Sequence, residues 1–359
     1  MASQLSVTGV SRTGGLHPKI SLPGIKGDEV DFYDYGTQNF SEVRRCLGLA
    51  GATDVYAAAF QEVKQFMSEF SSRDKRRGFR EIISSGASGS YFYFTPNRRF
   101  IVKTISKGEK ETLIAMGDSY LAHCRAHPDT LIQYLGCHSI RLPLNTRKIY
   151  FVVMRNVLAC PRRADLTFDL KGATSNRQRA RGAAMAAMLS GERAPATFST
   201  LMDIDFLRLA QAKPPPAVGV PLGLGAAARQ ELKRIIVADA AFLSARQLMD
   251  YSLLLGIVHN SSPPAGATGY GVVGGENGET YYLGIIDVLE QWGGMKWPMQ
   301  GAILKFFFRY IACGRWYNPE GITAVPPDDY AARFEEFLLQ EVLGVDAPAP
   351  RARTWSPFW

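Results

Sequence analysis

The residues that first indicate chemistry form a turn of small residues, Ser84–Phe94, between two predicted strands. Gly86 and Gly89 allow the backbone to approach a ligand closely, and Ser88 adds a hydroxyl donor between them. Successive N–H groups in such a turn can point at phosphate oxygens. Lys103 stands inside the strand that follows, where an ammonium group is costly unless it meets anions. The layout predicts a nucleotide phosphate site, and a tight hairpin with a solvated lysine is the alternative.

Acidic residues at predicted strand ends form a second group. Asp169 and Lys171 lie in the run Asp-Leu-Lys-Gly, and Asp250 lies where a predicted helix gives way to an apolar strand. Asp287 ends the buried-strand pattern Tyr-Tyr-Leu-Gly-Ile-Ile. A carboxylate at a strand end either caps the next turn or holds a metal ion, and a nearby lysine suits phosphate handling. The simpler alternatives are turn caps for Asp250 and Asp287 and a surface cation for Lys171.

A third acidic pair, Asp203 and Asp205, lies in Met-Asp-Ile-Asp-Phe. Either carboxylate could lie near a metal ion or hold a neighbouring Lys or Arg side chain. We expect a structural role for Asp203 and leave both interpretations open for Asp205.

Size and composition limit the class of protein. The chain has 359 residues, is 46% hydrophobic and carries a formal net charge of +8. It is long enough for one large two-lobed domain, and its charge favours nucleic acid, anionic lipid or a phosphorylated small molecule as partner. The five cysteines show no metal-ligand spacing, which predicts reduced thiols in the cytosol. We expect neither a secretory signal nor a membrane span.

The elements that must position these residues follow from hydrophobic periodicity. We expect a flexible arm over 1–30, a helix through Phe40 and Val43 with Ser41 as its N-cap, and a hinge at Met154–Val157. The remaining predictions are helices over 55–70, 107–127 and 227–248, strands over 91–94, 131–134, 149–154 and 281–286, loops or insertions over 182–200, 212–226 and 261–279, and a flexible tail over 343–359.

In this order, the motifs resemble those of the phosphatidylinositol phosphate kinases. The resemblance covers roughly 31 to 342, and it rests on the glycine turn, Lys103 and the runs Asp-Leu-Lys-Gly, Met-Asp-Tyr-Ser-Leu-Leu and Ile-Ile-Asp. It implies an α+β, two-lobed kinase-like fold of the phosphatidylinositol phosphate kinase / SAICAR synthase-like type, with antiparallel sheets in each lobe. The lobes would span 31–156 and 157–342.

The resemblance also implies roles for the residues that bind ATP. Gly86, Ser88 and Gly89 would cover the ATP phosphates, and Lys103 would contact the α- and β-phosphates. Glu111 would orient Lys103. Met154 and Asn156 would contribute to the nucleotide site from the hinge.

For the transfer itself, Asp250 would accept or align the substrate hydroxyl, and Asp287 would bind Mg²⁺. Lys171 would lie near the transferred phosphoryl group, with Asp169 orienting it or assisting at the metal. The five residues that follow Asp250, Tyr251–Leu255, include no Asn of the kind that a protein kinase uses for its second metal ion, so the pattern argues against an ordinary protein kinase.

The resemblance implies that residues 288–325 and Arg177 would contact the lipid. Residues 288–325 hold aromatic side chains interleaved with Lys and Arg, which suits a membrane interface. Lys296, Trp297 and Lys305 are the predicted membrane or substrate contacts. A core-facing amphipathic helix over 297–313 is the alternative. In the family, one position of this segment distinguishes phosphatidylinositol 4-phosphate from the 5-phosphate as substrate. Either Met299 or Lys305 occupies that position here, and neither is the acid expected there.

We therefore predict a magnesium- and ATP-dependent phosphatidylinositol phosphate kinase, with the 4-phosphate as substrate and the 5-hydroxyl as acceptor, at the cytosolic face of a membrane. A homodimer through the N-lobe is a further expectation, and nucleic acid is not expected as a partner. The alternatives are a soluble inositol-phosphate or protein kinase, and a catalytically weak membrane adaptor with the same fold.

Overall fold

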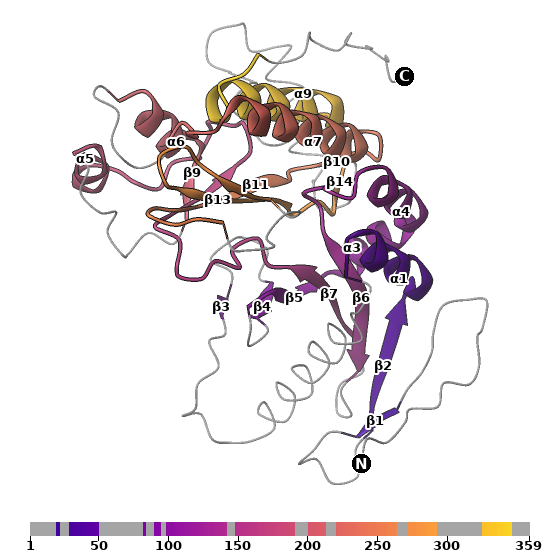
Figure 1. The fold of residues 1–359 in the computed structure, drawn as a ribbon. Helices are drawn as coiled ribbons and strands as arrows, with labels where there is room; N and C mark the ends of the chain where they lie inside the picture. The colour runs from indigo at the N-terminus through magenta and orange to yellow at the C-terminus, as the bar shows by residue number, and fades with distance from the viewer. Residues whose placement is uncertain are drawn as a thin grey trace, which may run out of the picture. The chain divides into compact units, whose positions relative to one another are not determined.

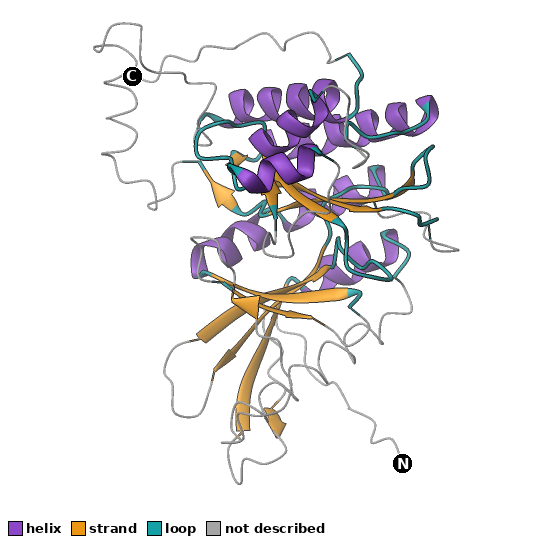
Figure 2. Cartoon of the chain, turned by 90° about the vertical axis from the view of Figure 1, so that its left-hand side faces the viewer, coloured by secondary structure: helices purple, strands orange, loops and turns teal. Residues whose placement is uncertain are grey.

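The computed structural model describes residues 19–21, 29–49, 82–83, 90–94, 98–141, 148–190, 200–212, 220–263, 271–292 and 325–346. These residues fall into two compact units. The first draws on Met1–Pro128 and Gln133–Ala159, and the second on Asp129–Ile132 and Cys160–Trp359. Each unit has its own β-sheet and its own helices (Figures 1 and 2).

The first unit is built on a seven-stranded antiparallel sheet in the order β1-β2-β6-β7-β5-β4-β3. The predicted strands over 91–94 and around Lys103 are confirmed. The strands are β1 (Lys19–Ser21), β2 (Glu29–Tyr35), β3 (Ile82–Ile83), β4 (Tyr91–Phe94), β5 (Phe100–Ile105), β6 (Tyr134–Arg141) and β7 (Lys148–Arg155).

The helices of the first unit are α1 (Thr37–Cys46), α3 (Lys107–Ala115) and α4 (Gly117–Ala126). Ser41 is not the N-cap of α1: the helix begins four residues earlier, after Gly36, whose φ of 61° suits a residue without Cβ. The helix predicted over 107–127 is two helices that meet at Met116, because the poor helix former Gly117 follows it. Ser106 and Glu109 form a capping box at the start of α3.

The strand predicted over 131–134 is wrong, since the strand starts at Tyr134. Leu131 belongs to the second unit and is fully buried there. Its N–H donates to Asp239 Oδ2 at 2.8 Å, and its carbonyl accepts from Ile285 N at 2.9 Å. Contacts with a distant segment therefore decide the conformation of this short apolar run.

The second unit contains a five-stranded sheet in the order β12-β13-β11-β8-β9 and a two-stranded sheet of β10 and β14. All pairs are antiparallel except β8 with β9, which is parallel and departs from the predicted pattern. The strands are β8 (Leu166–Leu170), β9 (Leu201–Met202), β10 (Leu248–Met249), β11 (Ser252–Val258), β12 (Val272–Gly274), β13 (Thr280–Ile286) and β14 (Glu290–Gln291).

Helices α7 (Ala226–Ser244) and α9 (Pro327–Phe337) pack side by side along one face of this sheet (Figures 1 and 2). Helix α7 ends before the predicted 248 because Gln247 adopts a left-handed φ of 58° ahead of β10. The predicted loop over 261–279 includes β12, and the predicted insertion over 182–200 includes α5. The other helical segments are α5 (Ala183–Leu189), α6 (Asp203–Ala210) and the π-helical turn η2 (Leu338–Val342). No helix in the described ranges is long and apolar enough to cross a membrane.

Candidate active site at one end of the second sheet

Strand register brings three predicted site segments to the same end of the second sheet. Leu253 of β11 pairs with Leu170 of β8, and Ser252 of β11 pairs with Ile286 of β13. Because these pairs are antiparallel, the end of β8, the start of β11 and the end of β13 coincide. Lys171 and Asp287 directly follow β8 and β13, and Asp250 lies two residues before β11.

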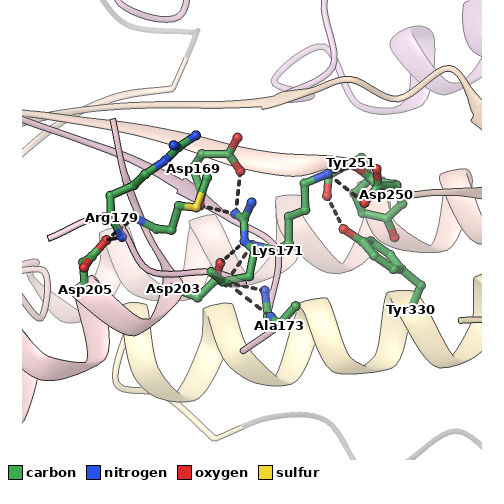
Figure 3. A network of polar contacts seen from close by, with 12 residues as sticks. Asp169, Lys171, Ala173, Arg179, Asp203, Asp205, Asp250, Tyr251 and Tyr330 are labelled. Carbon is green, nitrogen blue, oxygen red and sulfur yellow. Dashed lines mark hydrogen bonds and ion pairs between the residues drawn. The ribbon is translucent and has the colours of Figure 1, made fainter. Parts of the chain in front are cut away.

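Lys171 and Asp250 form a direct ion pair. Lys171 Nζ lies 2.8 Å from Asp250 Oδ1, and it also donates to the backbone carbonyl of Asp250 (Figure 3). The Lys171 side chain is 12% exposed and that of Asp250 is 33% exposed. The ammonium group is thus largely enclosed, and the Asp250 side chain is partly exposed although its Oδ1 is buried against Lys171.

Asp203 holds the loop that carries Lys171. Its fully buried Oδ1 accepts hydrogen bonds from the backbone N–H groups of Lys171 at 2.8 Å, Gly172 at 2.7 Å and Ala173 at 3.3 Å (Figure 3). Its Oδ2 lies 2.6 Å from Arg177 Nε. This structural role matches the expectation for Asp203.

Arg177 links the same loop to β8 and is buried, with its side chain 9% exposed. Its Nη2 lies 2.8 Å from Asp169 Oδ1 and also donates to the carbonyl of Asp169. Burial opposes the charge, yet the carboxylates of Asp169 and Asp203 outweigh it and raise the pKa of Arg177. The predicted lipid contact by Arg177 is therefore corrected to an internal ion-pair role, and Asp169 pairs with Arg177 rather than with Lys171.

Asp205, which the sequence leaves open, is a backbone anchor. Its fully buried carboxylate accepts from Arg179 N at 2.9 Å, Ala180 N at 3.0 Å and Met202 N at 3.0 Å. These bonds fix the chain between β8 and α6. Both Asp205 oxygens accept backbone N–H groups, so this carboxylate is not placed to bind a metal ion.

Asp287 could bind a metal ion that is also coordinated by the substrate. It is exposed and has a left-handed φ of 60°, as does Asp250. Magnesium is usually held by one or two carboxylates with phosphate oxygens and water. In the described part of the chain, no group of three His, Cys, Asp or Glu side chains could hold a metal ion alone. A single exposed carboxylate such as that of Asp287 therefore fits an Mg²⁺ ion whose other ligands are phosphate oxygens and water.

In the first unit, Lys103 lies on β5 and is 7% exposed. Its Nζ lies 5.5 Å from the ring centroid of Phe92 on β4. Glu111 does not meet it: the Glu111 side chain is 56% exposed and pairs with Lys107 at 3.6 Å and Lys110 at 3.7 Å. The prediction that Glu111 orients Lys103 is corrected, because α3 turns this residue toward solvent.

The hinge residues are buried at the end of β7. Met154 is 7% exposed and Asn156 is 5% exposed. Asn156 Nδ2 donates to the carbonyl of Arg98 at 2.7 Å, and its Oδ1 accepts from Leu158 N at 3.1 Å. The Asn156 side chain therefore ties the β4–β5 connection to the chain after β7.

Several predicted site residues lie outside the described residues: Gly86, Ser88, Gly89, Lys296, Trp297, Met299 and Lys305. Conversely, Tyr330 reaches the site without having been predicted as part of it. Its hydroxyl donates to the carbonyl of Tyr251, next to Asp250 (Figure 3). Nothing in the local sequence indicates a contact across 79 residues.

A scan of family models matches residues 74–271 to the family described as Phosphatidylinositol-4-phosphate 5-Kinase. The chain belongs to the phosphatidylinositol-4-phosphate 5-kinase family. The matched region contains Lys103, Lys171 and Asp250, and it ends before Asp287.

Curated members of the phosphatidylinositol-4-phosphate 5-kinase family agree. The chain is 36% identical to phosphatidylinositol 4-phosphate 5-kinase its3 of Schizosaccharomyces pombe over 178 residues, 49% of this chain and 21% of that protein. It is 26% identical to a phosphatidylinositol 4-phosphate 5-kinase of Plasmodium falciparum over 292 residues, 72% and 15% respectively. It is 28% identical to phosphatidylinositol 4-phosphate 5-kinase 6 of Arabidopsis thaliana over 321 residues, 73% and 41%. The match thus spans less than half of each relative.

Proposed function

We propose that this protein is a magnesium- and ATP-dependent lipid kinase that phosphorylates the 5-hydroxyl of phosphatidylinositol 4-phosphate at a membrane surface. Membership of the family supports the substrate class. The observation that carries the chemistry is the meeting of Lys171, Asp250 and Asp287 at one end of the β8–β11–β13 sheet.

In this proposal the two units are the lobes of a kinase-like fold of the phosphatidylinositol phosphate kinase / SAICAR synthase-like type. The N-lobe would span 31–156 and the C-lobe 157–342. The antiparallel sheet of the first unit, with Lys103 buried on its interior strand β5, supports the first assignment. Lys103 would bind the α- and β-phosphates of ATP, and Gly86, Ser88 and Gly89 would cover them.

The transfer needs little covalent help from the protein, because its main demands are alignment and neutralisation of charge. The 5-hydroxyl oxygen forms a bond to the γ-phosphorus as the bond to the β–γ bridging oxygen breaks and ADP leaves. The carboxylate of Asp250 aligns the hydroxyl and accepts its proton. The Lys171 ammonium, held 2.8 Å from that carboxylate, orients it and adds positive charge beside the transferred group.

Asp287 is the residue that would hold Mg²⁺. When bound, the ion would neutralise the negative charge that gathers on the phosphate oxygens. Lys296, Trp297 and Lys305 would contact the membrane or the lipid headgroup from the segment after Asp287, where aromatic rings and cations suit the interface.

A transfer assay with radiolabelled ATP on vesicles that hold a defined phosphatidylinositol monophosphate tests this function, with product isomers resolved. We expect the 4,5-bisphosphate from the wild type, and a loss of several orders of magnitude in Asp250→Asn and in Asp287→Asn. Glu231→Gln, an exposed charge removal on α7, is the matched control.

Other outcomes distinguish the alternatives. Equal turnover of the soluble headgroup and of vesicles would favour a soluble inositol-phosphate kinase. Near-normal turnover in Asp287→Asn would contradict the metal assignment. A wild type that transfers no phosphate and shows no magnesium-dependent ATP binding would indicate an adaptor.

A further inference from the structure

We propose that Tyr330 is a positioning residue for Asp250, and that helix α9 supports both loops that supply the Lys171–Asp250 pair. The proposal rests on the proposed function, since it takes Asp250 as the residue that aligns the acceptor hydroxyl. Tyr330 itself does not belong to the reacting groups: its hydroxyl bonds to the backbone of Tyr251, and it acts on Asp250 through that bond.

Two successive carbonyl groups beside the reacting carboxylate are held from different directions. Lys171 Nζ donates to the carbonyl of Asp250, and the Tyr330 hydroxyl donates to the carbonyl of Tyr251 (Figure 3). The backbone between them is unusual, because Asp250 has a φ of 60°. A residue with a side chain rarely adopts this conformation, and it persists only where neighbouring contacts enforce it. The two donors are contacts of that kind.

The Tyr330 side chain has little freedom to release its bond. It is fully buried, and its ring meets that of Tyr251 edge to face with centroids 4.7 Å apart. Phe334, one turn further along α9, meets the same Tyr251 ring at 4.9 Å. Burial raises the pKa of Tyr330 well above its ordinary value, so the hydroxyl stays protonated and remains a donor at physiological pH.

The same helix closely approaches the loop of Lys171. Gly172 has a φ of 67°, and a Cβ built there would lie 3.0 Å from the carbonyl oxygen of Arg333 and 3.1 Å from Cβ of Phe337. A Cβ here would crowd the helix and strain the backbone, and glycine avoids both. Tyr330 and Arg333 are three residues apart in α9, on neighbouring turns of one helix face. One rigid element therefore sets the positions of both partners of the ion pair.

This arrangement predicts a specific kinetic defect. Loss of the Tyr330 hydroxyl leaves the ring packing in place but lets the Asp250 backbone relax. The acceptor hydroxyl is then aligned less often, while nucleotide binding does not depend on this bond. The turnover number should fall and KM for ATP should not change.

The experiment compares Tyr330→Phe with Tyr281→Phe in the full chain. Tyr281 is the matched control: it is equally buried in the same unit, and its hydroxyl accepts a hydrogen bond from Gly223 N at 3.0 Å, at a site the proposed reaction does not use. Steady-state transfer to phosphatidylinositol 4-phosphate vesicles gives kcat and KM, thermal unfolding gives Tm, and amide hydrogen exchange is followed over residues 249–253.

We expect Tyr330→Phe to lower kcat about tenfold with KM for ATP within about twofold, and to speed amide exchange over 249–253. Tyr281→Phe should shift Tm similarly and leave kcat and that exchange unchanged. Equal kcat values in the two variants, with an active wild type, overturn the proposal and leave the proposed function intact. An inactive wild type overturns the proposed function. In that case amide exchange over residues 249–253 tests the positioning role by itself, and unchanged exchange in Tyr330→Phe overturns it.

Discussion

The replacement Asp203→Asn isolates the charge that organises the Lys171 loop. The variant keeps the size of the side chain and can still accept from the three N–H groups that meet Oδ1. It loses the carboxylate that lies 2.6 Å from Arg177 Nε, and the buried Arg177 side chain keeps only Asp169 as an acidic partner among the described residues.

The expected cost follows from these contacts. Breaking one partner of a buried ion pair costs about 3–5 kcal/mol, and we take about 3 kcal/mol because Asp169 still compensates part of the Arg177 charge. Each of the three N–H bonds loses its charge assistance, worth about 0.5 kcal/mol apiece. The free energy of unfolding should therefore fall by about 4–5 kcal/mol, measured by urea denaturation of the second unit's transition.

A double-mutant cycle with Arg177→Met tests the reasoning. Arg177→Met alone leaves Asp203 buried with three backbone donors but without its ion-pair partner, and should cost about 3 kcal/mol. The double variant contains neither buried charge, so its cost should be at least 2 kcal/mol less than the sum of the two single costs. Costs that add to within about 0.5 kcal/mol would refute the claim that the two charges depend on each other.

Two further predictions concern charges outside this network. Arg162 lowers the pKa of Asp165, chiefly through its side-chain hydrogen bonds, so this contribution to stability is present above the unfolded pKa of about 3.9 and is lost as pH falls toward the lower folded value. Asp165→Asn should thus lower Tm at pH 7 by more than at pH 3; a gap that does not change with pH would contradict this. Glu111→Gln should leave kcat within about twofold of the wild type, because this carboxylate is exposed and pairs with lysines of its own helix; a loss of orders of magnitude in the transfer assay would restore it as the partner of Lys103.

The positions of the chemically important residues relative to strands could be predicted from the sequence. The alternation around Lys103 and the apolar runs that end at Asp287 or follow Asp250 indicate strands, and the structure contains β5, β13 and β11 there. This succeeds because a half-buried or fully buried strand leaves a local pattern of side chains. The helix ends were less predictable: no local pattern indicated that α1 would begin after Gly36 rather than after Ser41.

The partners of the charged residues could not be predicted. Arg177, Glu111 and Asp205 carry the same types of charge as the residues that face the proposed substrates, and their sequence spacing does not say which way they point. Arg177 turned inward to Asp169 and Asp203, and Glu111 turned outward to its neighbouring lysines. The burial and the ion-pair partners of a charged residue depend on which distant segments pack against it, and the local sequence does not indicate those segments.

The sequence by itself determined the family, the motif order, the strand that contains Lys103 and the strands that border Asp250 and Asp287, because these depend on short runs of residues. Only the tertiary structure decided that β8, β11 and β13 bring their site residues to one end, since register is fixed by pairing between segments about 30 to 80 residues apart. It also decided that Tyr330 supports the site, because a hydrogen bond to a backbone carbonyl places no demand on the identity of the residue that accepts it.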